Sequence, residues 1–440
     1  MTQIISTPNA ENSDAFGFNS HYQFGYYEAV NHGHRNAQQD ALTWMSLSEA
    51  DLTPKFPVGH LNAQDIGYRL WTAYRLLDSS SLKGGTTAST TVYDGKGSLI
   101  TATIADAASF AVAYDEIGKP LEVIRLNRRV HTTQNNDEIA RICENEGSFI
   151  SRNRVNGALN ITRSIGDLSL KHYGVCSEAD IDIFDLHAWK KQLASQGLAV
   201  STFQVINVCD GFTDPADALA TTEIKQKATM PQEEQDKLRK VKQEKYLLDI
   251  LNTLKNPGIL REDQLAKILV DQALKDESKD NVSAAVHTLK LGRRMLMGVY
   301  DGHGFDDAAC YVAENIGSIF KAQCKLIAAE YRKQVYSIYN NLVSYERDNP
   351  QSFKGTAQSS TSTVSSPKPI QRTDAMTRAS VQALPGQSIF PIDNDDDMKS
   401  KKAKYEETPV KPILNFIPDD DDDDSVKLII ADALSRKAKA

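Results

Sequence analysis

Short apolar runs separated by turn residues fill much of the chain, and they predict β-strands. The runs are rich in β-branched and aromatic residues and end at glycine or polar residues, as strands do. Asp94-Gly95 is a turn signal between two of them. We predict strands over YQFGYYEAV and ALTWMSL within residues 21–47, and over residues 86–93, 98–104, 109–114 and 203–209.

Other segments place apolar residues three or four positions apart, which predicts amphipathic helices. In the segment 63–77, Ile66, Leu70 and Leu77 would share one face. The segment 219–256 also has a helical pattern, but it is so highly charged that it is typical of a solvated insertion helix. Further helical patterns cover residues 137–146, 263–275 and 306–323, and the last continues to about residue 345.

Two β-type runs near the end of the apolar region lie very close together in the sequence. They are Asn281–Lys290 and Arg294–Tyr300, and only Leu-Gly-Arg separates them. Short connections that contain glycine commonly join neighbouring antiparallel strands. The spacing therefore predicts a β-hairpin.

The two ends of the chain differ in character from the middle. Residues 1–20 are polar, and we expect a loose segment there. Residues 350–440 are rich in Ser, Thr, Pro and Gln and include six consecutive aspartates at 419–424, so we expect a disordered, acidic tail. The aspartate run is typical of a solvating tail, although it could also bind cations or a basic partner. The folded domain should span residues 21–345.

Charge and cysteine content exclude several classes of protein. The 50 basic and 58 acidic residues give a net charge of −8 with no basic stripe, so nucleic acid is not the expected partner. No apolar run is long enough to span a membrane, and the first residues lack the pattern of a secretory signal. Five cysteines without a CxxC pair predict a reduced, intracellular protein with buried thiols.

Four aspartates stand in short motifs that could form one metal site. They are Asp40 in RNAQQD, Asp210 in VCDGFTD, Asp280 in SKDN and Asp301 in YDGHG. A lone Asp-Gly is ordinarily a turn signal. Three of the four aspartates, however, adjoin an apolar β-type run, and carboxylates gathered from strand ends make an oxygen cage suited to Mg²⁺ or Mn²⁺. His303, beside Asp301, could serve as a general acid.

Taken together, the motifs resemble those of the metal-dependent protein phosphatases of type 2C. The resemblance covers roughly residues 20–320. One feature departs from the family order, because DGHG follows the Glu-Asp element in the family but comes after the DN strand here. The chain therefore resembles a permuted member. The matching segments are Arg35 with Gln39-Asp40, GTTA at 85–88, ADA at 105–107, RVNG at 154–157, TRSIGD at 162–167, DGFTD at 210–214, SKDNV at 278–282 and DGHG at 301–304.

The resemblance implies a role for each candidate residue. Asp301 would bridge two metal ions, with the Gly302 carbonyl, Asp210 and Asp280 as further ligands, and Asp106 and Asp214 would hold a third, weaker ion. Arg35 would clamp the phosphate, and His303 would protonate the leaving oxygen. The family has a glutamate where this chain has Gln39, so we expect weaker binding of the second ion, for which Asp40 could compensate in part.

The resemblance also implies an α/β fold of two packed, mostly antiparallel sheets flanked by helices. The implied activity is hydrolysis of phosphoserine and phosphothreonine in phosphorylated proteins by a metal-activated water. Two alternatives stay open, namely an inactive relative that binds phosphoproteins and a two-metal phosphohydrolase of small phosphoesters. We expect a soluble protein of a reducing, cytoplasmic compartment, and a bacterial effector delivered into host cells is a further hypothesis.

Overall fold

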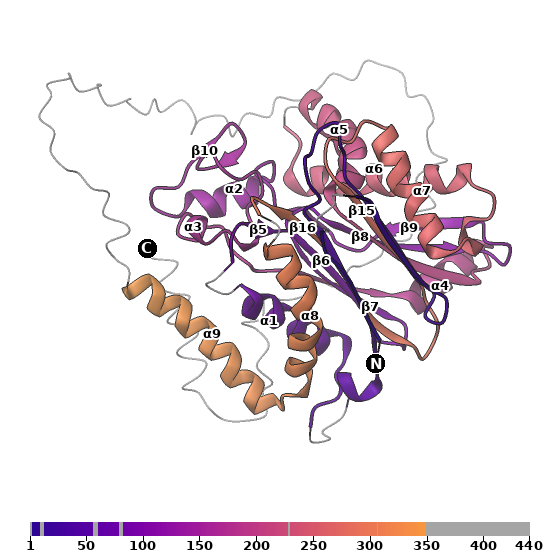
Figure 1. Cartoon of the computed structure of the whole chain (residues 1–440), viewed down its shortest axis with the longest axis horizontal. Coiled ribbons are helices and arrows are strands. Elements are labelled where there is room, and N and C mark those ends of the chain that lie inside the picture. Colours follow the sequence, from indigo (N-terminus) through magenta and orange to yellow (C-terminus); the bar gives the residue numbers. More distant parts are fainter. Residues whose placement is uncertain are drawn as a thin grey trace, which may run out of the picture. The chain divides into compact units, whose positions relative to one another are not determined.

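Two antiparallel β-sheets lie face to face in the computed structural model, which describes residues 2–8, 13–55, 60–78, 82–227, 229–305 and 307–348 (Figure 1). The first sheet has the order β1 (Gln3–Ser6), β4 (Asp40–Leu47), β16 (Arg294–His303), β6 (Ala88–Tyr93), β7 (Ser98–Ile104) and β13 (Asp180–Asp185), with short β5 (Gly85–Thr86) and β12 (Ile165–Gly166) beside it. The second has the order β2 (Ala15–Asn19), β3 (Phe24–Ala29), β15 (Val282–Thr288), β14 (Thr202–Val208), β8 (Ala108–Tyr114) and β9 (Pro120–Arg125).

Helices cover the outer faces of both sheets, as Figure 1 shows. The first sheet carries α1 (Ala63–Leu77) and α8 (Asp307–Lys325), and α9 (Ala328–Asp348) packs on α1. The second sheet carries α5 (Asp210–Gln226), α6 (Gln232–Thr253) and α7 (Glu262–Lys275). Between the sheets lies an apolar core in which the rings of Phe24 and Trp44 stack 5.2 Å apart. The predicted α/β fold of two antiparallel sheets flanked by helices is confirmed.

The remaining elements lie mostly between β9 and β13. They are α2 (Asn136–Cys143), β10 (Ile150–Ser151), β11 (Arg154–Val155) and α3 (Leu168–Lys171), followed after β13 by α4 (Leu186–Ser195). Two short 3-10 helices occur at Glu49–Leu52 and Pro257–Ile259. Within the described ranges, no helix combines the length and apolar character that crossing a membrane requires. The acidic tail predicted at 350–440 falls outside the described residues.

The predicted hairpin at residues 281–300 is wrong. β15 pairs with β3 and β14 in the second sheet, whereas β16 pairs with β4 and β6 in the first. The connection at Leu291-Gly292-Arg293 carries the chain from one sheet to the other, and Gly292 has the positive φ of 80° that the turn needs. Both faces of each strand are buried, so the apolar pattern could not show which neighbour each strand would choose.

The prediction of one solvated insertion helix over residues 219–256 is also wrong. The segment contains the end of α5 and all of α6, separated by residues 227–231. α6 packs on β9 and α5 and buries Leu247 and Leu251 completely. The polar residues Gln243 and Arg239 are buried on the same helix, where they bond the side chains of Asp217 and Gln134. Because some of the buried residues of α6 are polar, its sequence pattern resembles that of a solvent-exposed helix.

Residues 1–20 include strands where we expected a loose segment. β1 pairs with β4 and β2 pairs with β3, so each forms an outer strand of one sheet. Backbone hydrogen bonds to an existing strand hold these segments, and such bonds need little apolar content. The expectation of buried thiols holds for Cys209 and Cys324, whereas Cys143 is exposed.

Candidate active site

Six aspartates from both sheets gather at one end of the sandwich. Asp40 begins β4 and lies opposite Asp301 of β16 in the strand register. Asp106 lies in the turn from β7 to β8, and Asp280 immediately precedes β15. Asp210 is the first residue of α5, and only Cys209 separates it from the end of β14. Asp214 lies one helical turn further on, on the same face of the helix.

Burial and mutual repulsion both act on these carboxyl groups. Burial first, and then the charges of Asp210 and of other neighbouring aspartates, raise the pKa of Asp214 to about 8 and that of Asp280 to about 6. Burial raises the pKa of Asp40 to about 7, with Asp280 and Asp210 adding to the effect. The same causes raise the pKa values of Asp301 and Asp106 well above the ordinary range for aspartate. A bound cation would offset the repulsion among these closely spaced carboxylates.

The donor set fits a hard divalent cation. One oxygen each of Asp210 and Asp106 is buried without a hydrogen-bond partner, which is unusual for a carboxylate. Across the described part of the chain, no three acidic, histidine or cysteine side chains already surround a single point as metal ligands. In this structure Arg35 pairs with Asp280, and the carboxyl of Asp301 bonds that of Asp210.

Arg35 is positioned beside these acids by a short loop. Its side chain is 42% exposed and forms an ion pair with Asp280, and Asp301 and Asp210 also act on its charge. Asn281 holds the loop, since its Oδ1 accepts from the backbone N of Asn31 at 3.3 Å. The Asn281 amide also donates to the carbonyl of Ala37 at 2.8 Å. The SKDN and RNAQQD motifs are thus joined in space.

Asp40 is held from two sides by the second sheet. Its Oδ2 accepts from the Ser283 hydroxyl at 2.5 Å, and the thiol of Cys209 also bonds the carboxyl group. Gln39 contributes its carbonyl, which accepts from Gly302 N at 3.1 Å, and its side chain is half-buried. The neighbouring Gln38, which sequence reasoning overlooked, is buried, and its Oε1 accepts from the backbone N of Gln39 at 3.1 Å.

Gly302 is needed where β16 passes the start of β4. A Cβ at this position would lie 2.5 Å from the carbonyl oxygen of Gln39, closer than real Cβ atoms come. The glycine therefore lets the DGHG backbone approach the RNAQQD segment closely. This contact places Asp301 and Asp40 next to each other although 261 positions separate them in the chain (301 − 40).

His303 has a partner that the sequence motifs did not reveal. Its Nε2 lies 2.6 Å from Oδ2 of Asp167, the last residue of TRSIGD. Burial would raise the pKa of Asp167, but the hydrogen bond and charge of His303, helped by Ser164 and Lys171, bring it below the ordinary range. The backbone of Asp167 has a φ of 50°, in the left-handed region. Nothing in the apolar pattern marks such a contact between distant loops.

Asp217 is a second residue that sequence reasoning missed. It lies three residues after Asp214 on α5, and both of its carboxyl oxygens accept from Gln243 of α6, at 2.8 and 2.9 Å. Burial raises its pKa, and its own charge acts in turn on Asp106 and Asp214. The helical spacing from Asp210 to Asp214 to Asp217 was the available signal.

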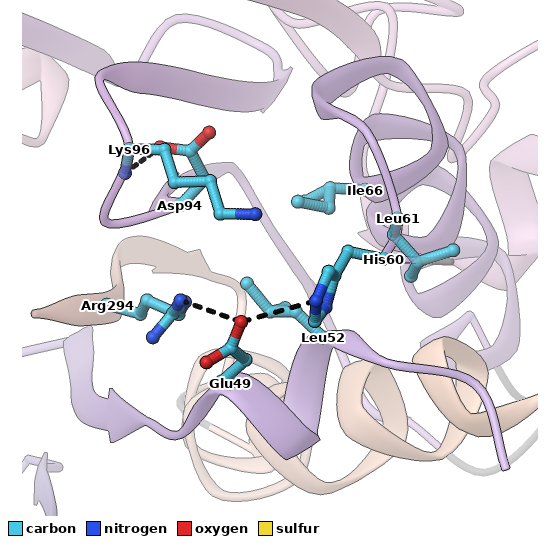
Figure 2. Close-up of a pocket in the computed structure, with 8 residues that line it drawn as sticks. All are labelled: Glu49, Leu52, His60, Leu61, Ile66, Asp94, Lys96 and Arg294. Carbon is cyan, nitrogen blue, oxygen red and sulfur yellow. Dashed lines mark hydrogen bonds and ion pairs between the residues drawn. The ribbon is translucent and has the colours of Figure 1, made fainter. Parts of the chain in front are cut away.

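A separate pocket lies at the opposite end of β16 (Figure 2). Glu49 is central to it, with the His60 ring 3.4 Å and the Arg294 guanidinium 3.6 Å away. The other acid, Asp94, is engaged by its own turn, because its Oδ1 accepts from the backbone N of Lys96 at 2.7 Å. Glu49 and Asp94 are the two acids of this pocket, and each has basic or backbone partners rather than a crowd of neighbouring carboxyl groups, so the aspartate cluster is the candidate site.

Several solved structures are similar to this chain. A serine-threonine phosphatase 2C from Toxoplasma gondii shows 14% identity and a TM-score of 0.36 over 66% of this chain and 99% of that one. A phosphatase from a pathogenic strain of Toxoplasma gondii shows 13% identity and a TM-score of 0.35, over 68% of this chain and 99% of that one. A serine/threonine phosphatase of S. agalactiae shows 15% identity and a TM-score of 0.29, over 65% of this chain and 98% of that one. With TM-scores this low, these similarities carry no functional argument.

A family model gives the more direct comparison. Residues 10–215 match the model described as protein phosphatase 2C. The matched segment contains Arg35, Asp40, Asp106, Asp167 and Asp210, whereas the SKDN and DGHG motifs lie beyond it. At family level the match supports a metal-dependent protein phosphatase. The resemblance of this chain to the type 2C protein phosphatases, predicted from its motifs, is therefore confirmed.

Proposed function

We propose that this protein is a metal-dependent phosphatase that removes phosphate from phosphoserine and phosphothreonine in proteins. The observation that carries the proposal is the crowded aspartate cluster, with buried, unpartnered oxygens on Asp210 and Asp106 and with Arg35 and His303 beside it. The family match over residues 10–215 supports the same conclusion.

The metal ions would be Mg²⁺ or Mn²⁺, and the oxygen donors of the aspartate cluster would hold them. When bound, such ions would acidify a water molecule and neutralise charge on the phosphate. Asp40 would orient the ligands around it, because a hydroxyl and a thiol already bind its carboxylate. The proposed ligands are Asp301, the Gly302 carbonyl, Asp210 and Asp280, then Gln39 and Asp40 for a second ion, and Asp106 with Asp214 for a third.

Arg35 would bind the phosphate. Its planar guanidinium matches two phosphate oxygens at once, and it carries its charge at all relevant pH values. In this structure it neutralises Asp280 instead. Its half-exposed position lets the side chain leave Asp280 when other cations neutralise that acid, and it can then turn toward a substrate.

His303 would donate a proton to the leaving oxygen of the seryl or threonyl group. An alkoxide is a poor leaving group, so a proton delivered to it lowers the barrier for phosphate release. The His303 side chain is 28% exposed, which allows an incoming peptide to reach the ring.

We also infer that the strand order is permuted relative to the family. The DGHG strand β16 is the last of the described strands in the sequence, yet it lies between β4 and β6, and β4 begins at the end of RNAQQD. Chain connectivity costs little free energy compared with burial of the core, so a rearranged order can keep the same site.

Phosphate release from a phosphothreonine peptide, with Mn²⁺ titrated from zero to millimolar, tests the proposal. Activity should rise with Mn²⁺ and disappear in Asp301→Asn. The matched control is Asp182→Asn, which removes a buried, ion-paired aspartate of β13 outside the cluster and should keep the activity. Folded protein that releases no phosphate at any Mn²⁺ concentration would refute the proposal and favour a phosphoprotein-binding relative.

A further inference from the structure

The contact between His303 and Asp167 is built by three chain segments that meet at β5. His303 pairs with Gly85 in one direction, and Gly166 pairs with the same Gly85 in the other. His303 ends β16 and Asp167 directly follows β12, so the two residues lie at the ends of strands on either side of β5. Their separation of 2.6 Å is that of a charge-assisted hydrogen bond.

Gly85 leaves the space in which this hydrogen bond forms. A Cβ on Gly85 would lie 2.1 Å from Oδ2 of Asp167 and 2.6 Å from Nε2 of His303. Any other residue at this position would push the two groups apart. The absence of a side chain at residue 85 is thus a structural condition for the His303–Asp167 pair.

The backbone of Asp167 is fixed from both sides. Its N donates to the Gly84 carbonyl at 2.8 Å, and the preceding Gly166 N donates to Oδ1 of Asp78 at 2.9 Å. Lys171 lies 3.0 Å from the other Asp78 oxygen and donates to the Ser164 carbonyl at 2.7 Å. The φ of 50° at residue 167 is one that Asp and Asn adopt more readily than most residues.

We propose that Asp167 is a positioning residue for His303, holding the proton on Nε2 so that Nδ1 is the nitrogen that serves the substrate. This inference rests on the proposed phosphatase function. Among the described residues, Nδ1 of His303 has no hydrogen-bond partner in the protein. As the phosphorus–oxygen bond breaks, the Nδ1 proton passes to the leaving oxygen. The ring is then neutral, with its remaining proton on Nε2 facing Asp167.

A merely structural ion pair would behave differently from a positioning pair. Loss of a structural contact would lower the activity toward all phosphate esters to a similar extent. Loss of the positioning contact would matter most for substrates whose leaving group needs a proton. A phosphothreonine peptide has an alkoxide leaving group, whereas p-nitrophenyl phosphate releases a phenolate that departs without one.

The test compares Asp167→Asn, His303→Ala and the double variant on both substrates at saturating Mn²⁺. Asparagine tolerates the left-handed backbone, so the single variant should fold, which circular dichroism verifies. We expect kcat on the peptide to fall about 10- to 100-fold in Asp167→Asn and the aryl phosphate rate to fall less than about threefold. The double variant should be no slower than His303→Ala alone, since residues that act as a unit are not additive. Asp182→Asn is the matched control.

Each outcome decides a separate question. Equal losses on both substrates, or additive losses in the double variant, would overturn the role of Asp167 while leaving the phosphatase proposal intact. An unmodified protein without activity on either substrate would refute the phosphatase function itself. Gly85→Ala provides a second variant, because it separates the pair but keeps both side chains, and it should show the same preference for the aryl substrate.

The tautomer of His303 can also be read without any turnover. In a long-range ¹H–¹⁵N spectrum of the folded protein, the neutral ring should carry its proton on Nε2 and have an unprotonated Nδ1. Asp167→Asn should change this ¹⁵N signature. A neutral ring protonated on Nδ1 in the unmodified protein would overturn the inference, whatever the activity data show.

Discussion

The crowding of acids at the end of the sandwich predicts that removing one of them will stabilise the metal-free protein. The perturbation is Asp301→Asn. Asp301 bonds the carboxyl of Asp210, and Asp40 and Asp280 add their charges. An asparagine amide could donate to Asp210 in its place, so the variant would lose the repulsion and keep a hydrogen bond.

The size of the effect follows from the repulsion between two neighbouring carboxylates. Two unit charges about 4 Å apart, at an effective dielectric constant of about 20, repel by about 4 kcal/mol. The protein avoids part of this cost by retaining protons on the cluster. We therefore expect Asp301→Asn to raise the free energy of unfolding of the metal-free protein by about 2–4 kcal/mol at pH 7.5.

The pH dependence gives the sign a second check. Folding raises the pKa of Asp301. The destabilisation caused by Asp301 is therefore absent below its pKa in the unfolded chain, about 3.9, and grows as the pH rises toward its pKa in the folded protein. The stability difference between the variant and the unmodified protein should then be close to zero near pH 4. It should increase steadily toward pH 7.5.

Urea unfolding in the presence of a chelator, at pH 4, 5.5 and 7.5, measures these differences. The same series with Mn²⁺ should reverse the ranking. A ligand at about 100 times its Kd stabilises the folded state by about 2.7 kcal/mol, and only the protein with Asp301 should gain it. The reasoning would be refuted if the metal-free variant were less stable at pH 7.5, or if its advantage did not change with pH.

Three further predictions follow from single positions. Gln39→Glu should lower the Mn²⁺ or Mg²⁺ concentration for half-maximal activity by about tenfold, because it adds a charged donor beside the Gly302 backbone; an unchanged metal titration would contradict this. Gly302→Ala should destabilise the protein by about 1–3 kcal/mol and abolish phosphate release, since its Cβ would lie 2.5 Å from the Gln39 carbonyl oxygen; urea unfolding measures the first effect. Leu247→Ala should lower the free energy of unfolding by about 2–5 kcal/mol, because Leu247 is fully buried. Val241→Ala, at a 42% exposed position of the same helix, should change it by less than about 0.5 kcal/mol. Equal small effects would mean that α6 is not part of the core.

The positions of most strands and helices were available from the local sequence. α1 spans Ala63–Leu77, as its apolar periodicity predicted, and β7 spans Ser98–Ile104. Such elements are set by residues within one or two turns, so a short window contains their signal. The sheet to which each strand belongs is a different matter. Only residues 289–293 separate β15 from β16, a spacing typical of a hairpin, yet the two strands enter different sheets.

The candidate ligands were predictable for a different reason. Aspartates beside apolar runs mark strand ends, and strand ends in a two-sheet sandwich can meet at one edge. The motifs predicted that these aspartates lie close together, but they did not show which residues would contact each of them. That Asp40 is held by Ser283 and Cys209, and that Arg35 pairs with Asp280, depends on contacts between residues far apart in the chain.

The sequence by itself determined the apolar pattern of the elements, the chemistry of the aspartate motifs and the family resemblance, because each is written in residues that are close together. Only the tertiary structure decided that β16 lies between β4 and β6, and that Asp167 meets His303 across Gly85. Both arrangements arise from packing between distant segments. The free energy of such packing depends on shape and burial in three dimensions, which no local pattern records.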